Sequence, residues 1–223
     1  MSVITISRQY GSLGNEIAAR TCEILGYRLF DRTLMAHLAS RIGLSEDEVV
    51  DYSESNYKAP TILNQLISLL TTPPGETPAV TQSSTWQRGT TGAQIRVVEK
   101  VNEARGVLIV SQTIRAASQV GNVVIVGRAG QAVLQQTSDV LHVRIEAPLD
   151  VRVRRVQELE NLSLQDAQKR ITVRDKDSGR YVKHFYNADW SDPTRYHLVI
   201  NTGKWDVEAA AKLIVDAVGL LKA

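Results

Sequence analysis

Short runs of apolar and β-branched residues, each followed by a segment with the apolar spacing of a helix, limit what this chain can fold into. The runs are SVITIS at 2–7, YRLFD at 27–31, VVIVG at 123–127, LHVRI at 141–145 and HLVIN at 197–201. Mostly apolar, β-branched runs are typical of strands buried on both faces. The helix-period segments lie at 15–25, 129–136, 149–159 and 207–221. Alternating strands and helices with short connections predict an α/β fold of three layers, with about five parallel strands between helices.

Composition and charge narrow the class of protein. The chain has 223 residues, 43% of them hydrophobic and 22% charged, which suits one globular domain. Its net charge of +2 is too small to indicate a nucleic-acid polymer or a membrane surface as the partner. A single cysteine, Cys22, allows no internal disulfide, and neither a secretory signal nor a membrane span is recognisable. We therefore expect a cytoplasmic enzyme or binding protein.

The stretch from 45 to 105 interrupts the alternation of strands and helices. Helices are expected at 45–54, where Ser45 begins a capping box, and at 60–70. Residues 71–92 are rich in proline, glycine, threonine and serine, which indicates a long loop or flap. The prediction for 45–105 is a mainly helical insertion or acceptor-side subdomain within a single domain of 1–223. An apolar face on the second helix would suit a homodimer; it comprises Ile62, Leu66, Leu69 and Leu70.

The first strand continues into RQYGSLGNEIAAR at 8–20, a glycine-spaced turn that begins a helix. Such a turn presents backbone N–H groups and the positive end of the helix dipole to an anion. The Walker pattern requires lysine and then serine or threonine after its last glycine, whereas Gly14 is followed by Asn15 and Glu16. The pattern alone leaves open both a phosphate-binding loop and a plain strand–turn–helix connection. Arg8 is a candidate for the missing cation.

Four separated motifs occur along the chain in a fixed order. They are SRQYGSLGNEIA, LGYRLFDRTLM, VVIVGRAGQAVL and RDKDSGRYVKHFYNADWSDPTRYHLVINT. In sequence and order they resemble the cytidylate kinase-like family, a branch of the nucleoside monophosphate kinases with a P-loop fold. In that family the first loop typically reads S-R-x-Y-G-S-G-G-R-E-I, so the missing Walker lysine is a family trait. This chain departs from the family at Leu13, where a glycine is usual, and at Asn15, where a basic residue is usual.

The resemblance implies transfer of a phosphoryl group from ATP, with Mg²⁺, to a nucleoside monophosphate such as CMP or dCMP. It also implies roles for particular residues and an arginine-rich, lid-like segment at 152–185. The implied catalytic residues are Arg8, Arg155 and Arg174. The implied ATP-binding residues are Gly11, Ser12, Gly14 and Asn15, and Ser12 is also the implied ligand of the metal ion. The implied acceptor-binding residues are Asp31, Arg32, Arg128, Asp175 and Arg180.

Simpler alternatives stand beside these roles. Asp31 would equally cap the helix that follows it. For Arg128 the alternative is a solvated residue at a helix start; we favour the functional role, because a cation at a helix start opposes the dipole unless an anion is bound nearby. For Arg152 and Arg154 we expect a solvated, charged helix surface. Arg174 and Asp175 are expected to end a later helix, which Ser178–Gly179 breaks. The residues after Gly14 also leave open a second function, a nucleotide-binding or sensing protein that keeps the kinase fold with little or no catalysis.

Overall fold

The structure is a computed structural model that describes residues 2–30, 86–88, 94–96 and 103–221. The chain divides into two compact units, Met1–Asp31 with Ser118–Ala223, and Arg32–Ala117. In the second unit the described parts are an antiparallel strand pair and most of a helix; these are β3 (Trp86–Arg88), β4 (Gln94–Arg96) and α4 (Glu103–Val120). The strand pair was not predicted. The helices expected at 45–54 and 60–70 lie outside the described residues, so the helical insertion and the homodimer stay predictions.

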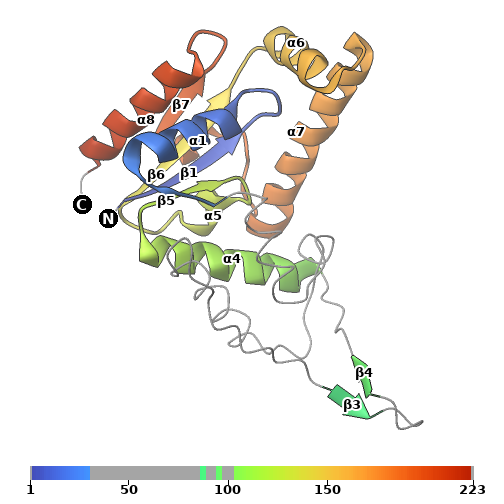
Figure 1. Cartoon of the computed structure of the whole chain (residues 1–223), viewed down its shortest axis with the longest axis vertical. Coiled ribbons are helices and arrows are strands. Elements are labelled where there is room, and N and C mark those ends of the chain that lie inside the picture. Colours follow the sequence, from blue (N-terminus) through green and yellow to red (C-terminus); the bar gives the residue numbers. More distant parts are fainter. Residues whose placement is uncertain (1, 31–85, 89–93, 97–102, 222–223) are drawn as a thin grey trace. The chain divides into compact units, whose positions relative to one another are not determined.

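All five expected strands form, and together they make one parallel sheet in the first unit (Figure 1). The strands are β1 (Val3–Arg8), β2 (Arg28–Phe30), β5 (Val123–Val126), β6 (Val140–Glu146) and β7 (Leu198–Asn201). Their order is β2-β5-β1-β6-β7, so β1 lies in the middle with a later strand on either side. Such a position is a topological switch point, and ligands of open α/β sheets bind there, beyond the carboxyl ends of the strands.

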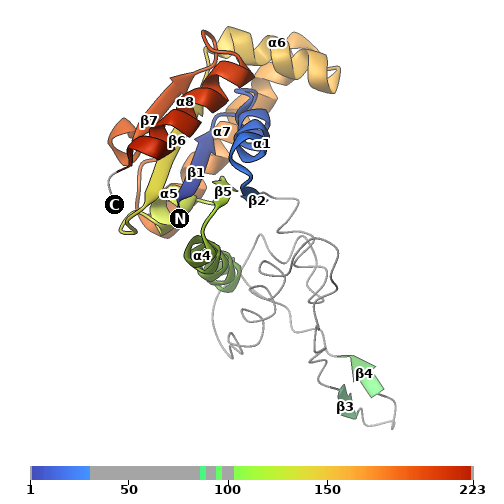
Figure 2. The ribbon, with the colours of Figure 1, turned by 60° about the vertical axis from the view of Figure 1, so that its left-hand side comes forward.

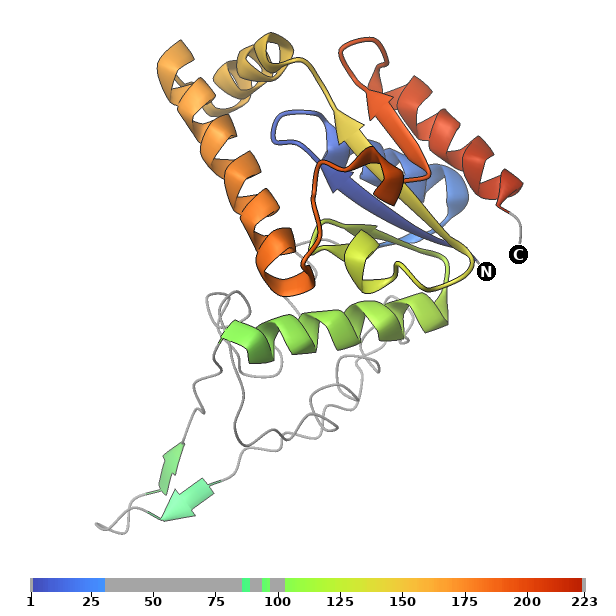
Figure 3. The ribbon, with the colours of Figure 1, turned by 180° about the vertical axis from the view of Figure 1, so that it is seen from behind.

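Helices cover both faces of this sheet, as the sequence predicts. The helices wholly within this unit are α1 (Gly14–Leu25), α5 (Gly130–Val133), α6 (Leu149–Glu160), α7 (Leu164–Tyr186) and α8 (Val207–Leu220). Figure 2 shows α1 and α8 side by side on one face. Figure 3, seen from behind, shows α5 and the C-terminal end of α7 on the other face. Among the described helices there is none with the length and apolar character needed to cross a membrane.

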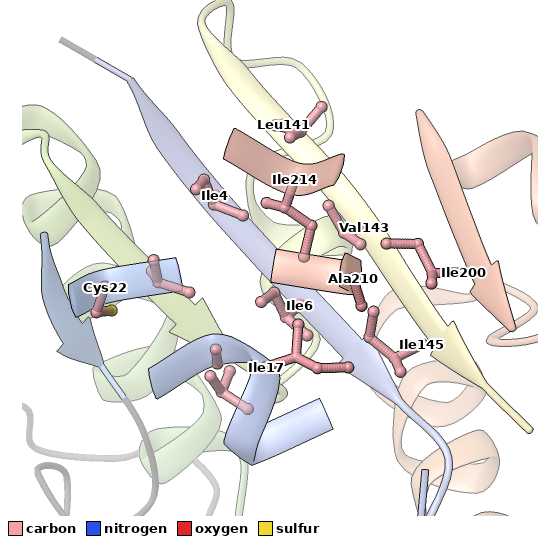
Figure 4. Packing of buried hydrophobic residues seen from close by; sticks show 13 residues of the cluster. Ile4, Ile6, Ile17, Cys22, Leu141, Val143, Ile145, Ile200, Ala210 and Ile214 are labelled. Carbon is pink, nitrogen blue, oxygen red and sulfur yellow. The ribbon is translucent and has the colours of Figure 1, made fainter. Parts of the chain in front are cut away.

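A core cluster lies between the sheet and the helices α1 and α8 (Figure 4). Side chains of a strand alternate between its two faces, so β6 sends Leu141, Val143 and Ile145 into this core. His142 and Arg144 point to the opposite face, where the parallel register places them beside Thr5 and Ser7 of β1. The opposite face of the sheet is therefore polar toward the carboxyl ends of its central strands.

Helix α7 differs from its prediction, because it continues for 23 residues through Ser178 and Gly179. A glycine inside a helix costs only about 1 kcal/mol. Packing outweighs that cost, since Ile171 before the glycine and Val182 after it are both buried. The expected helix break is therefore wrong. Helix α5 is shorter than the expected 129–136. It starts one residue later, because Ala129 has a left-handed backbone (φ 54°), and it ends at Val133, with Leu134 outside the helical region (φ −104°, ψ 13°).

Candidate functional site

The loop between β1 and α1 turns tightly at the carboxyl edge of the sheet. Gly11 and Leu13 both have left-handed backbones, with φ of 78° and 63°. A Cβ on Gly11 would lie 2.9 Å from Cγ2 of Val156, so the loop packs against α6 where only glycine fits. Leu13 precedes α1 and provides no side-chain cap to the helix. The positive end of α1 and its first-turn amides are therefore suited to an anion.

Arg8 places a positive charge beside this loop, next to Gly14 and Asn15. Its Nε donates to Oδ1 of Asn15 at 3.1 Å. A Cβ on Gly14 would lie 2.4 Å from Cβ of Arg8, and a Cβ on Gly127 would lie 2.5 Å from its Nη1. The side chain thus crosses Gly14 and its guanidinium reaches the end of β5. Asn15 follows Gly14 as the lysine does in the Walker pattern, so the positive charge of Arg8 lies next to that position.

A cavity of about 250 Å³ opens beside Arg8. Its walls come from the end of β1, the turn after β5, the C-terminal half of α7 and the segment after α7; the lining residues are Ser7, Arg8, Gly127, Arg128, Ala129, Gln131, Asp177, Ser178, Tyr181, Val182 and Trp190. Two guanidinium groups and two large aromatic rings therefore share one cavity. Arginine binds phosphate oxygens, and aromatic rings stack against flat apolar groups. These walls therefore suit a ligand that has a phosphate group and a flat ring.

The turn that carries Arg128 has an unusual backbone. Gly127, Arg128 and Ala129 are all left-handed, with φ of 71°, 54° and 54°. Such conformations cost of order 1–3 kcal/mol for a residue other than glycine, and they gather at functional sites. Arg128 is half-buried in the cavity wall, which differs from the simple solvated helix start that we weighed against a functional role.

Arg152 is buried, which contradicts the solvated position expected for it; only 7% of the residue is exposed. Its Nη1 lies 2.6 Å from Oδ2 of Asp175, and Oδ1 of Asp175 accepts from the N–H of Tyr10 at 2.9 Å. This ion pair therefore ties the loop between β1 and α1 to α6 and α7. The sequence pattern does not predict which basic residues of α6 face the loop between β1 and α1 and which face the solvent. Arg154 is solvated as expected, with 67% of its side chain exposed and Asp150 as its partner.

Arg155 braces the other side of the loop. It donates from Nη1 to the carbonyl oxygen of Gly11 at 3.4 Å and from Nη2 to that of Thr202 at 2.7 Å. Thr202 in turn donates from Oγ1 to the carbonyl oxygen of Ser12 at 2.9 Å. Burial lowers the pKa of Arg155, and the nearby Glu16 carboxylate partly opposes that effect. Thr202, at the end of β7, is a loop contact that the sequence analysis missed.

The remaining expected site residues are placed less directly, and their roles stay predictions. Ser12 is fully buried and its Oγ donates to the carbonyl oxygen of Gln9 at 2.8 Å, and its expected role on the metal stays a prediction. The guanidinium of Arg174 lies 5.6 Å from the ring centre of Tyr10. Arg180 is exposed and pairs with Asp177, and only the aspartate lines the cavity. Asp31 and Arg32 lie outside the described residues.

Arg144 is a further charged residue near the site that the sequence analysis did not single out. It is 2% exposed, and its guanidinium carbon lies 4.2 Å from the ring centre of Trp190. A signal existed in the sequence, because Arg144 stands inside the otherwise apolar run LHVRI. A charge at an inward strand position requires buried partners.

Comparison with known proteins agrees with this fold. A protein from Eubacterium ventriosum, described as uncharacterized, superposes with a TM-score of 0.62 at 18% identity, covering 98% of this chain and 99% of that one. Shikimate kinase from Bacteroides thetaiotaomicron superposes with a TM-score of 0.50 at 12% identity, over 98% of each chain. At these identities the likeness shows the fold alone, that of the P-loop kinases.

Sequence relatives point to a narrower group. The cytidylate kinase of Methanocaldococcus jannaschii is 36% identical over 104 residues, which are 46% of this chain and 58% of the relative. That of Pyrococcus horikoshii is 31% identical over 102 residues, 46% of this chain and 52% of the relative. The chain thus spans little more than half the length of these curated relatives. The sequence profile described as the cytidylate kinase-like family matches residues 3–204, so the chain belongs to the cytidylate kinase-like family.

Proposed function

We propose that this protein is a nucleoside monophosphate kinase that transfers a phosphoryl group from ATP to CMP or dCMP. The observation that carries the proposal is the position of Arg8, between the glycine turn before α1 and the cavity beside Arg128. Phosphoryl transfer requires two phosphates held in line and cations on the charge that develops between them. Arg8 stands between the two places where those phosphates would bind.

The donor side of the proposal rests on the loop. The uncapped start of α1 would hold the ATP phosphates through backbone amides of Gly11 to Asn15, and Arg8 would supply the charge of a Walker lysine. Mg²⁺ would accompany ATP and neutralise phosphate charge when bound. It would take most of its ligands from phosphate oxygens and water, as Mg²⁺ does in kinases.

The acceptor side rests on the cavity. Arg128 would grip the phosphate of the nucleoside monophosphate, and the rings of Tyr181 and Trp190 would contact its base or sugar. The choice of CMP or dCMP is supported by the curated relatives named cytidylate kinase, which share about a third of their aligned residues with this chain.

A coupled ADP-release assay with CMP, dCMP, UMP, AMP and GMP tests the proposal. We expect the highest turnover with CMP or dCMP. Arg128→Ala should lower kcat/KM for the acceptor on the order of 100-fold, because it removes a charge that holds a reacting phosphate. Arg154→Ala is the matched control, since Arg154 is an exposed arginine that pairs with Asp150 away from the cavity lining. ATP binding without turnover of any acceptor would overturn the kinase proposal and leave a nucleotide-binding protein.

A further inference from the structure

We propose that Arg144 is a positioning residue of the cavity: it fixes Trp190 and Ser7 in the cavity wall and thereby sets the affinity for the phosphate acceptor. Both of these residues line the cavity, whereas Arg144 lies behind them. The inference rests on the proposed function, in which this cavity receives the acceptor.

The contacts of Arg144 converge on the wall. Its guanidinium stacks over the indole of Trp190 at 4.2 Å, and its Nη1 donates to the carbonyl oxygen of the same residue at 2.6 Å. The ring and the backbone of Trp190 are thus both held by one side chain. The parallel register places Arg144 directly beside Ser7. The same Nη1 therefore also contacts Oγ of Ser7, at the long distance of 3.5 Å.

Tyr196 completes the arrangement. Its hydroxyl donates to the carbonyl oxygen of Trp190 at 2.8 Å and lies 3.3 Å from Oγ of Ser7. Its ring centre is 5.5 Å from the guanidinium carbon of Arg144. Arg144 therefore lies between two aromatic rings, and the segment after α7 is fastened to β1 and β6 through this one cluster.

Stability alone does not account for a charge in this position. A guanidinium that is 2% exposed loses nearly all of its hydration, and its ionic partner Glu146 keeps 37% of its side chain exposed. Apolar residues of similar volume often replace buried ion pairs with no loss of stability, because the desolvation cost disappears with the charge. What an apolar side chain cannot supply is the planar set of donors that fixes both the ring and the carbonyl of Trp190.

The test compares Arg144→Met, which keeps bulk but loses the donors, with Tyr196→Phe, which removes a single hydroxyl and preserves the ring. Arg20→Met is the matched control, because Arg20 pairs with Glu208 at 2.6 Å between α1 and α8 and lines no part of the cavity. All variants carry Trp86→Phe and Trp205→Phe, so that Trp190 is the only tryptophan of the chain. Acrylamide quenching of Trp190 fluorescence and the separate KM values for CMP and ATP are measured.

We expect stronger quenching of Trp190 in Arg144→Met and Tyr196→Phe than in Arg20→Met. The KM for CMP should rise about tenfold in Arg144→Met, as expected for the loss of a desolvated cation–π contact, and less in Tyr196→Phe. The KM for ATP should stay unchanged, since the donor site lies on the loop before α1. If Arg144→Met does not fold, Tyr196→Phe decides by the same criteria.

Trp190 quenching in Arg144→Met and Tyr196→Phe equal to that in Arg20→Met would overturn the positioning role. Equal rises in the KM for CMP and the KM for ATP would overturn it too, because they indicate a protein that is less well packed as a whole. Absence of turnover with every acceptor in the unsubstituted chain overturns the proposed function instead. In that case the quenching comparison alone decides whether Arg144 positions Trp190.

Discussion

Gly127→Ala is expected to slow phosphoryl transfer about 100-fold and to cost no more stability than Gly26→Ala. The two glycines share one backbone conformation, which sets the cost in stability, and they differ in the atoms around them, which set the effect on the rate. Both have left-handed backbones, with φ of 71° at Gly127 and 68° at Gly26. A side chain in this conformation costs roughly 1–2 kcal/mol, so both variants should lose a similar free energy of unfolding. Among the described residues other than its two chain neighbours, no atom lies within 4 Å of a Cβ on Gly26, whereas a Cβ on Gly127 would lie 2.5 Å from Nη1 of Arg8.

The added methyl group of Gly127→Ala has to displace the guanidinium of Arg8. Ordinary contact begins at 3.4 Å, so the shift is about 1 Å. The guanidinium is the far end of a flexible side chain and can yield at little cost in stability. A misplacement of about 1 Å in a group that positions the reacting phosphate costs on the order of 100-fold in rate.

Coupled ADP release with CMP and thermal unfolding are measured for Gly26→Ala, Gly127→Ala, Arg8→Ala and the double variant of Arg8 and Gly127. Because the methyl group acts through Arg8, Gly127→Ala should add little to the defect of Arg8→Ala. Turnover in Gly127→Ala equal to that in Gly26→Ala would refute the reasoning. A further 100-fold loss in the double variant, the same factor as in the single variant, would refute it as well.

Two further predictions concern stability. Arg152→Met should lower the free energy of unfolding by about 3 kcal/mol or more, because it leaves Asp175 without its buried partner, whereas the exposed Arg154→Met should cost no more than ~0.5 kcal/mol; urea unfolding compares the two. Burial, followed by repulsion from His197, lowers the pKa of His142 from the ordinary 6.5 to about 4. Between about pH 6.5 and pH 4 His142 is therefore protonated in the unfolded chain but neutral in the folded chain. The free energy of unfolding decreases as the pH is lowered through this window, by about 2 kcal/mol at pH 5. Urea unfolding at pH 7 and pH 5 should show this slope in the unsubstituted chain and a smaller slope in His142→Asn; equal slopes would contradict the assignment to His142.

The strands and most helices of the sheet were predictable because their signal is local. A run such as VVIVG at 123–127 has few alternatives to a buried strand. The meeting of the glycine loop with the Gly127–Arg128 turn was also predictable, since carboxyl ends of parallel strands share one edge. The sequence also makes Arg8 a candidate for the missing cation; its guanidinium contacts Asn15, and its catalytic role stays a prediction.

The surroundings of the charged side chains were not predictable. Arg152 and Arg154 are two residues apart on the same helix, and only the packing of α6 against the loop makes one buried and the other exposed. The helix break at Gly179 was wrongly predicted for the same kind of reason, because buried contacts on either side outweighed a local propensity. Arg144 depends on Trp190 and Tyr196, partners more than 45 residues away along the chain.

The side chain of Arg8 constrains how the residues around it can change over generations. It crosses Gly14 and reaches Gly127, so a side chain at either position would collide with it. The contact with Asn15 imposes no comparable limit, because the loop typical of the family has basic residues at positions 8 and 15 together. A smaller residue at position 8 would remove the collision at positions 14 and 127. Positions 8, 14 and 127 should therefore be inherited as one linked set.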